Sequence, residues 1–185
     1  MRARIAAAAY ETAASAGING LRMRAVAEAA GISQGALLHH FPDKNALVLA
    51  AIEQALLLAK QDSESWLETR SNEPEAVLQA MLAEFRAFFF SDRFWVAMGI
   101  TMEAAKDHSF EPAVRAMVSS LRVPIYEAWA GRLSDVGWPR EDAARTVRSG
   151  AYLISGAAVR RFWAEPDPLS SEVENEWLAD RLRDL

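Results

Sequence analysis

The fold of this 185-residue chain is decided by residues 24–41, which read RAVAEAAGISQGALLHHF. The stretch predicts two short helices joined by a tight turn. The first, Met23 to Ala30, ends at Gly31, which can adopt the left-handed backbone that a sharp exit from a helix needs. Ser33 can cap the second helix. Pro42 ends it, because the residue before a proline avoids the helical conformation.

The apolar residues of this stretch fit a helix-turn-helix. Ala27 is small enough for two steeply crossing helices to touch there. Ile32 and Leu37 fall where a small core needs them, beside Val26 and Ala30. The second helix of such a unit enters the major groove of duplex DNA, so the geometry predicts a DNA-binding head.

The outer surface of the predicted head suits DNA. Small residues let the backbone approach base edges and a thymine methyl, and glutamine can read adenine or bridge to phosphate. Histidine, arginine and lysine can contact phosphate, and Lys44 stands at a helix start, where N–H groups attract anions. The predicted DNA-binding residues are Arg22, Arg24, Ser33, Gln34, Gly35, Ala36, His39, His40 and Lys44.

The distribution of charge along the chain also favours DNA binding by the head. Residues 1–45 hold five basic and three acidic side chains, a formal charge of +2, and the whole chain carries −5. The remaining residues therefore carry −7. A mildly basic head on an acidic body directs the head toward phosphate.

Helical spacing runs through the rest of the chain, and patterns typical of strands are nearly absent. We therefore predict an all-α fold of about nine helices, with a DNA-binding domain at 1–45 and a ligand-binding and dimerisation domain at 46–185. We expect Gly17 to close the first helix and Asp43 to cap the fourth. We expect Pro124 to kink or interrupt its helix and Ser171 with Glu174 to form a capping box. The predicted helices are 4–16, 23–30, 34–41, 43–70, 75–90, 94–106, 112–136, 140–163 and one beginning near Ser171.

The head closely resembles the amino-terminal domain of the TetR (tetracycline-repressor) family of transcriptional regulators. The resemblance covers about the first quarter of the chain, and the rest is similar only in length and helical layout. The matching residues are Arg4-Ile5, Ala8-Ala9, Gly17, the run from Arg24 through Val26, Ala27, Ala30-Gly31-Ile32-Ser33 and Gly35 to Leu37, and His40-Phe41 with Lys44 and Leu47.

Three positions depart from the family pattern. Leu38 stands where members often carry a tyrosine that contacts phosphate. Arg22 replaces the usual Thr or Ser cap of the second helix, at a typical cost of about 1 kcal/mol. Thr12 and Ala13 occupy a region where an aromatic residue is common. These departures alter individual contacts and leave the motif intact.

The body is rich in aromatic residues and methionine. Such side chains can be plain core, or together they can line an apolar cavity. The resemblance implies a small-molecule inducer pocket here. Glu103 could orient a polar or cationic ligand or be an exposed ion-pairing residue, and Pro124 could leave backbone carbonyls for ligand contacts. The predicted ligand-binding residues are Trp66, Phe85, Phe89, Trp95, Met98, Met102, Glu103, Tyr126 and Trp129.

The helix predicted at 140–163 has two packing faces, one apolar and one of small residues. Either it is buried within its own chain or one face meets a partner. The resemblance favours a homodimer in which two chains form a four-helix interface, placing two recognition helices about 34 Å apart or a multiple of that. The predicted interface residues are Val147, Ala151, Ile154, Ala158 and Phe162.

Enzyme chemistry finds little support. The chain has no cysteine, no phosphate-cradling glycine loop, no nucleophile elbow and no metal-ligand spacing. His39 and His40 point about 100° apart on a helix and cannot share one ion.

We predict a homodimeric, one-component regulator, a repressor that binds a pseudo-palindromic operator through residues 24–44. A small, mostly apolar ligand releases it.

We expect this regulator to need no cofactor. No apolar run reaches the ~18 residues of a membrane span and no secretory signal is visible, so we expect a cytoplasmic protein. The alternative is an all-helical carrier or enzyme with a vestigial DNA-binding head.

Overall fold

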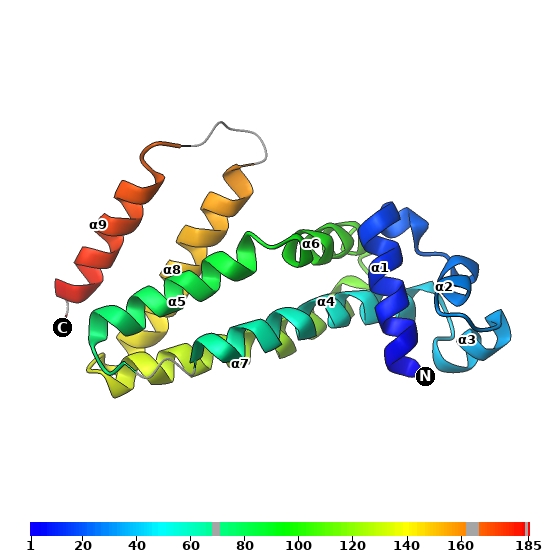
Figure 1. Ribbon diagram of the computed structural model, residues 1–185, viewed down its shortest axis with the longest axis horizontal. Helices are drawn as coiled ribbons and strands as arrows, with labels where there is room; N and C mark the ends of the chain where they lie inside the picture. The colour runs from blue at the N-terminus through cyan, green and yellow to red at the C-terminus, as the bar shows by residue number, and fades with distance from the viewer. Residues whose placement is uncertain (68–70, 162–166, 184) are drawn as a thin grey trace. The chain divides into compact units, whose positions relative to one another are not determined.

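The computed structural model describes residues 1–67, 71–161, 167–183 and 185. Within them the chain forms nine α-helices and no strand (Figure 1), so the predicted all-α class is confirmed. No helix in these ranges is both long and apolar enough to cross a membrane. The helices are α1 (Arg2–Gly20), α2 (Met23–Ala29), α3 (Gln34–His40), α4 (Lys44–Leu67), α5 (Pro74–Phe89), α6 (Asp92–Ala104), α7 (Glu111–Asp135), α8 (Arg140–Arg160) and α9 (Ser170–Arg183).

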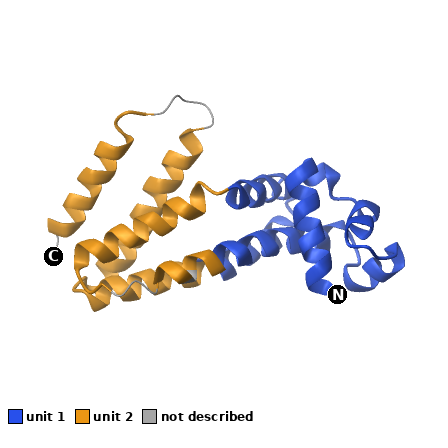
Figure 2. Cartoon of the chain, viewed as in Figure 1, with its two compact units in different colours: residues 1–60, 92–122 blue, residues 61–91, 123–185 orange. Residues whose placement is uncertain are grey.

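The chain divides into two compact units, residues 1–60 with 92–122 and residues 61–91 with 123–185 (Figure 2). Two of the three boundaries fall inside long helices, so α4 and α7 contribute to each unit, and the third lies between α5 and α6. The first unit is larger than the 1–45 head expected from the sequence, because α6 packs against α1.

In the first unit, α1 packs on α2 and α2 packs on α3. Their small core consists of fully buried side chains, each of which stabilises the fold by roughly 1.5–3 kcal/mol relative to exposure. On α1, burial raises the pKa of the Tyr10 phenol above its usual value, and the charge of Glu11 adds to the shift. The core side chains are Ile5, Leu21, Val26, Leu37, Phe41 and Leu47.

In the second unit, α5 packs on α8 and both contact α9. The helices approach closely at Gly150, where an added Cβ would lie 3.1 Å from Met81 Cε and 3.2 Å from the Trp177 ring. None of the described residues of α9 is buried, so α9 lies on the surface of this unit. The core side chains include Val77, Leu78, Met81, Phe85, Trp129, Leu133, Val147, Ala151, Ile154 and Ala158.

Several helix ends follow the predicted signals and others do not. Gly17 leaves the helical conformation at φ 65°, as predicted, but helix resumes directly and α1 reaches Gly20. The predicted interruption at Pro124 is wrong, because α7 continues through it. Val123 and Pro124 are exposed, as is Ser120, whose carbonyl the proline leaves without its helical partner. Because Ser120 is exposed, water can hydrate that carbonyl, which avoids the cost of a buried unpaired group.

The predicted capping box of α9 is also wrong. The helix begins at Ser170, which places Ser171 inside it, and the Glu174 carboxylate forms an ion pair with Arg86 instead. Asp167 precedes the helix, and its Oδ1 accepts a hydrogen bond of 3.0 Å from the Leu169 N–H. The predicted ends of the fourth and eighth helices, Arg70 and Trp163, lie outside the described residues.

Candidate nucleic-acid interface

The turn between α2 and α3 is built as the sequence predicts. Gly31 has φ 63°, a left-handed conformation that glycine adopts without a steric penalty. The Ile32 N–H donates to the Ala27 carbonyl at 3.0 Å, which closes the turn. At the start of α3 the Ser33 hydroxyl accepts from the Ala36 N–H at 3.2 Å, so the predicted cap is confirmed.

Most residues of helix α3 are exposed. Leu37 is its one buried residue and anchors the helix to the head. The predicted contact residues Gln34, Gly35 and His39 are exposed, as is Ser33 before them, while Ala36 and His40 are half-buried. Leu38 is also exposed, at 44%. A short helix held by one buried anchor, with mostly polar and small residues outward, can enter a groove without losing its core contact.

The start of α2 lacks the side-chain cap common in this motif. Arg22 occupies the cap position with extended backbone and makes no side-chain cap bond, as its sequence position predicts. The Arg24 Nε donates to Glu28 Oε1 at 2.8 Å. This hydrogen bond raises the pKa of the Arg24 guanidinium above its usual value. Both side chains remain exposed, so Arg24 stays within reach of a phosphate but shares its charge with Glu28.

Lys44 begins α4 and is exposed. The cap of this helix is Asp43, as predicted, since its Oδ1 accepts from the Ala46 N–H at 2.8 Å. A cation at a helix start gains nothing from the helix dipole. Lys44 and the adjacent N–H groups instead make this end of α4 attractive to an anion such as a backbone phosphate.

Sequence reasoning missed a contact at the other end of α3. The Arg2 guanidinium lies 4.5 Å from the centre of the Phe41 ring, and its Nη1 donates to the His40 carbonyl at 3.0 Å. In the sequence, Arg2 is recognisable only as one of the five positive charges of residues 1–45. No local pattern signals the contact, because 38 positions separate the two partners.

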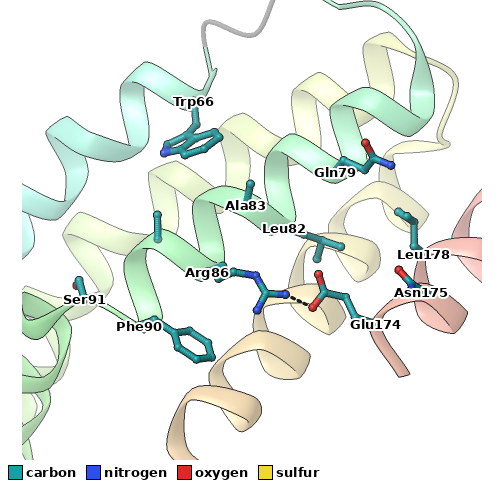
Figure 3. A pocket seen from close by; sticks show the side chains of 11 residues that line it. Trp66, Gln79, Leu82, Ala83, Arg86, Phe90, Ser91, Glu174, Asn175 and Leu178 are labelled. Carbon is teal, nitrogen blue, oxygen red and sulfur yellow. Dashed lines mark hydrogen bonds and ion pairs between the residues drawn. The ribbon is translucent and has the colours of Figure 1, made fainter. Parts of the chain in front are cut away.

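The second unit holds a surface hollow of about 600 Å³ between α5 and α9. Figure 3 shows the Arg86 guanidinium of α5 turned toward Glu174 of α9, with which it forms an ion pair. Aromatic and aliphatic side chains make up much of the wall. The lining residues are Trp66, Gln79, Leu82, Ala83, Arg86, Ala87, Phe90, Ser91, Glu174, Asn175 and Leu178.

Of the nine predicted ligand residues, this hollow includes only Trp66, which is 37% exposed. Four others belong to the same unit but sit in or beside its core, because they lie on the inward sides of α5 and α7; they are Phe85, Phe89, Tyr126 and Trp129. The remaining four lie on α6 of the first unit and are Trp95, Met98, Met102 and Glu103.

Two of these predictions need correction. Met102 is 65% exposed and does not point into a core or cavity of its unit. Glu103 is exposed and forms an ion pair with Lys106, three residues on, which is the alternative that the sequence left open. Met102 was chosen for its apolar character and Glu103 for its charge, and neither property tells which side chains of a helix meet water.

The predicted dimer stripe also needs correction. Val147, Ala151, Ile154 and Ala158 are at most 2% exposed within a single chain, because this face of α8 packs on α5. Phe162, the fifth residue, lies outside the described residues. The stripe was chosen for its apolar character, and the same property favours burial in the chain's own core.

The described part of the chain contains no group of three or more His, Asp or Glu side chains arranged to hold a metal ion. His39 and His40 pack edge to face at 5.3 Å between ring centres. A capped, exposed helix presented past a glycine corner, on an all-helical body, defines a helix-turn-helix DNA-binding protein.

Comparison with known proteins gives the family. Residues 5–51 match the profile described as bacterial regulatory proteins, tetR family. The HTH-type transcriptional regulator CymR of Pseudomonas putida is 30% identical over 175 residues, which cover 95% of this chain and 86% of that protein. The chain belongs to the TetR family of bacterial transcriptional regulators. It is a DNA-binding regulator and not an enzyme, as predicted.

Solved structures share the fold over nearly the whole chain. A TetR-family transcriptional regulator from Mesorhizobium loti has a TM-score of 0.69 at 15% identity, with 98% of this chain and 93% of that chain covered. A transcriptional regulator from Saccharomonospora viridis, solved in complex with choline, has a TM-score of 0.68 at 17% identity, with 98% and 95% covered.

Proposed function

We propose that this regulator is a homodimeric repressor that reads a pseudo-palindromic operator through residues 24–44 and releases it when a small molecule binds the helical body. The observation that carries the proposal is the exposed outer face of α3, held to the head by the buried Leu37. A dimer seated on an operator blocks access of polymerase to the DNA. Because its target is chromosomal DNA, we place the protein in the cytoplasm.

A second copy of the chain is proposed to cover the outward face of α8. That face carries Arg148, Tyr152 and Gly156, spaced one helical turn apart, and Tyr152 is 72% exposed. A large aromatic ring beside a glycine suits a two-fold contact, since each ring can lie over the small residue of the other copy. A two-fold dimer presents two α3 helices to two half-sites.

The effector is proposed to bind in the hollow between α5 and α9. Trp66 offers an aromatic face, and Arg86 with Glu174 offers charge. The Phe90 ring is already stacked by the guanidinium groups of Arg86 and Arg161, 5.8 and 5.3 Å from its centre. To release DNA, the effector must bind the DNA-incompetent conformation more tightly, because equal affinity for both states shifts nothing. Choline is the first probe, because a carboxylate and the Trp66 ring attract a quaternary ammonium group and a structural neighbour holds choline.

DNA binding is tested by a gel shift with duplexes from the regions flanking the gene, against scrambled duplexes of equal composition. We expect a preferred duplex that binds two protomers, as measured by light scattering of the complex. A complex with a single protomer would contradict the dimer, and equal affinity for both duplexes would contradict operator recognition.

Effector binding is tested by titrating choline against the wild type and the Trp66→Ala variant, with calorimetry as the measurement. Binding that the variant loses supports the hollow as the effector site. Binding that the variant retains in full contradicts that placement.

A further inference from the structure

Helix α3 has only seven residues, Gln34 to His40, and includes Gly35. Helices this short are marginal on their own, and glycine weakens them further. The position of α3 therefore depends on how its two ends are held. Ser33 holds the amino-terminal end through its hydroxyl, but the carboxyl-terminal end has no equivalent local device.

The chain after α3 cannot supply the usual carboxyl-terminal cap. Such caps need a left-handed residue just past the helix, followed by backbone N–H groups that return to the last carbonyls. Here Phe41 has extended backbone with φ −136°, and its N–H is already donated to Leu37. Pro42 has no N–H to donate. The residues that follow α3 therefore offer no N–H group to the His40 carbonyl, and its donor must be water or a group elsewhere in the head.

Arg2 is that donor. Its Nη1 lies 3.0 Å from the His40 carbonyl oxygen, and its guanidinium stacks over the Phe41 ring at 4.5 Å. Phe41 is 1% exposed, so the ring is a fixed platform. A positive charge at a helix carboxyl terminus is also favourable to the helix dipole. The single side chain thus combines a cap, a charge and a stacking contact.

We infer that Arg2 is a positioning residue for DNA recognition, which fixes the carboxyl-terminal end of α3 from the start of α1. It acts through α3 and has no base contact of its own. This inference rests on the proposed reading of DNA by α3. When α3 is held at both ends, its outer residues meet the base edges in one orientation. When it is held only at Ser33, the far end can shift.

A phosphate contact is the alternative role for an exposed arginine in this head, and the two roles have different signatures. Loss of a phosphate contact weakens binding to every sequence and reduces the slope of log K against log salt by about 0.9. Loss of a positioning contact lowers the preference for the operator and leaves the salt slope on unrelated DNA unchanged.

The chain offers a matched control in Arg4. It lies two residues further along α1, is exposed, and its guanidinium donates only to Met1 Sδ among the contacts found for it, at 3.3 Å. Arg4→Ala removes the same charge from the same helix without touching α3. Arg2→Lys keeps the charge but cannot stack a planar group and donate at once.

The test measures the affinity of the full chain for two duplexes over a salt series. One is selected from a random-sequence pool by the wild-type protein, and the other is its scrambled counterpart. We expect Arg2→Ala to lower the ratio of the two affinities by about fivefold, which is the net effect of one typical hydrogen bond. The slope on scrambled DNA should equal that of Arg4→Ala, and Arg2→Lys should restore the ratio only in part.

A second measurement follows α3 directly. Amide hydrogen exchange at Leu38, His39 and Phe41 should become faster in Arg2→Ala and remain unchanged in Arg4→Ala. An unchanged affinity ratio, unchanged exchange, or a salt slope reduced by about 0.9 relative to Arg4→Ala would overturn the inference. Gln34→Ala distinguishes failure of the proposed function from failure of the inference about Arg2. If Gln34→Ala leaves the affinity ratio unchanged, the proposed reading of DNA by α3 fails. If it lowers the ratio while Arg2→Ala does not, only the inference about Arg2 fails.

Discussion

Among the predicted DNA contacts, Arg24 has its positive charge paired with a carboxylate of its own helix. It bonds Glu28 across one helical turn, and both side chains are exposed, where such pairs contribute little to stability. We expect Glu28→Gln to tighten binding to random-sequence DNA by about threefold at low salt, because a released cation can neutralise a phosphate. Fluorescence anisotropy over a salt series measures this.

Glu11→Gln is the control, since it removes the same charge from the exposed surface of α1. An equal gain in both variants would show that only net charge matters, which contradicts a specific role for Arg24.

Lys44 carries a second prediction for single residues. It is exposed at the first position of α4, beside backbone N–H groups that attract anions. We expect Lys44→Ala to weaken binding to all sequences alike and to lower the salt slope by about 1. A titration that finds the slope unchanged, or a loss confined to the operator, contradicts a phosphate contact.

Features of the head could be predicted from the sequence where their physical cause lies in neighbouring residues. The roles of Gly31 and Ser33 follow from the chemistry of one turn, and the exposure of most of α3 follows from the polar and small residues on either side of the two leucines. Arg2 could not be found in this way. Its two contacts join the beginning of α1 to the end of α3, and no spacing rule connects positions so far apart.

At the scale of helices, the packing of α8 depends on the absence of a side chain at Gly150. An added Cβ would meet Met81, Leu82 and Trp177 at 3.1–3.3 Å. Gly150→Ala gains about 1 kcal/mol of helix propensity but must displace neighbours on both α5 and α9, which typically costs 1–3 kcal/mol. We expect no gain, or a loss of up to about 2 kcal/mol in the free energy of unfolding.

Gly131→Ala in α7 is the matched variant, because nothing lies within 4 Å of an added Cβ there. It should stabilise the protein by about 1 kcal/mol, a rise in melting temperature of roughly 2–4 °C for a chain of this size. Equal stabilisation by both substitutions in thermal unfolding would contradict the close approach at Gly150.

Helix boundaries were predictable where the chain carries its own signal, as at Asp43. They failed where a residue's effect depends on its surroundings. Pro124 is tolerated inside α7 because its side of the helix meets water, and Glu174 leaves its predicted cap because Arg86 lies within reach. For the same reason the sequence could not tell which face of α8 is buried in its own chain. Periodicity identifies an apolar face but not the element that covers it.

In the whole molecule, sequence patterns did not show which distant segments pack together. The sequence suggested a head at 1–45 and a body behind it, but the first compact unit also takes in α6 and part of α7. The contact of α6 with α1 is made by segments more than 70 positions apart. The predicted ligand residues were one group by composition, yet they fall in both units. Composition alone could not have separated them.

The proposed homodimer can be tested by a substitution on the outward face of α8. In a two-fold interface each surface patch meets its own copy or lies close to it. A charge placed at Tyr152 would therefore approach Arg148 of its own helix and the corresponding charges of the second copy. We expect Tyr152→Arg to weaken the dimer at least about tenfold and to lower operator affinity more than affinity for scrambled DNA. Light scattering over a dilution series measures the first effect.

Tyr152→Phe keeps the ring and removes only the hydroxyl, so it should remain a dimer with wild-type discrimination. Tyr152 is 72% exposed in the single chain, so neither substitution disturbs the core of the unit, and unchanged thermal unfolding at low concentration will verify this. If Tyr152→Arg stays dimeric, the second copy does not cover the outward face of α8. If it becomes monomeric but still discriminates fully, one α3 helix suffices to read the operator and the two half-sites are not read together.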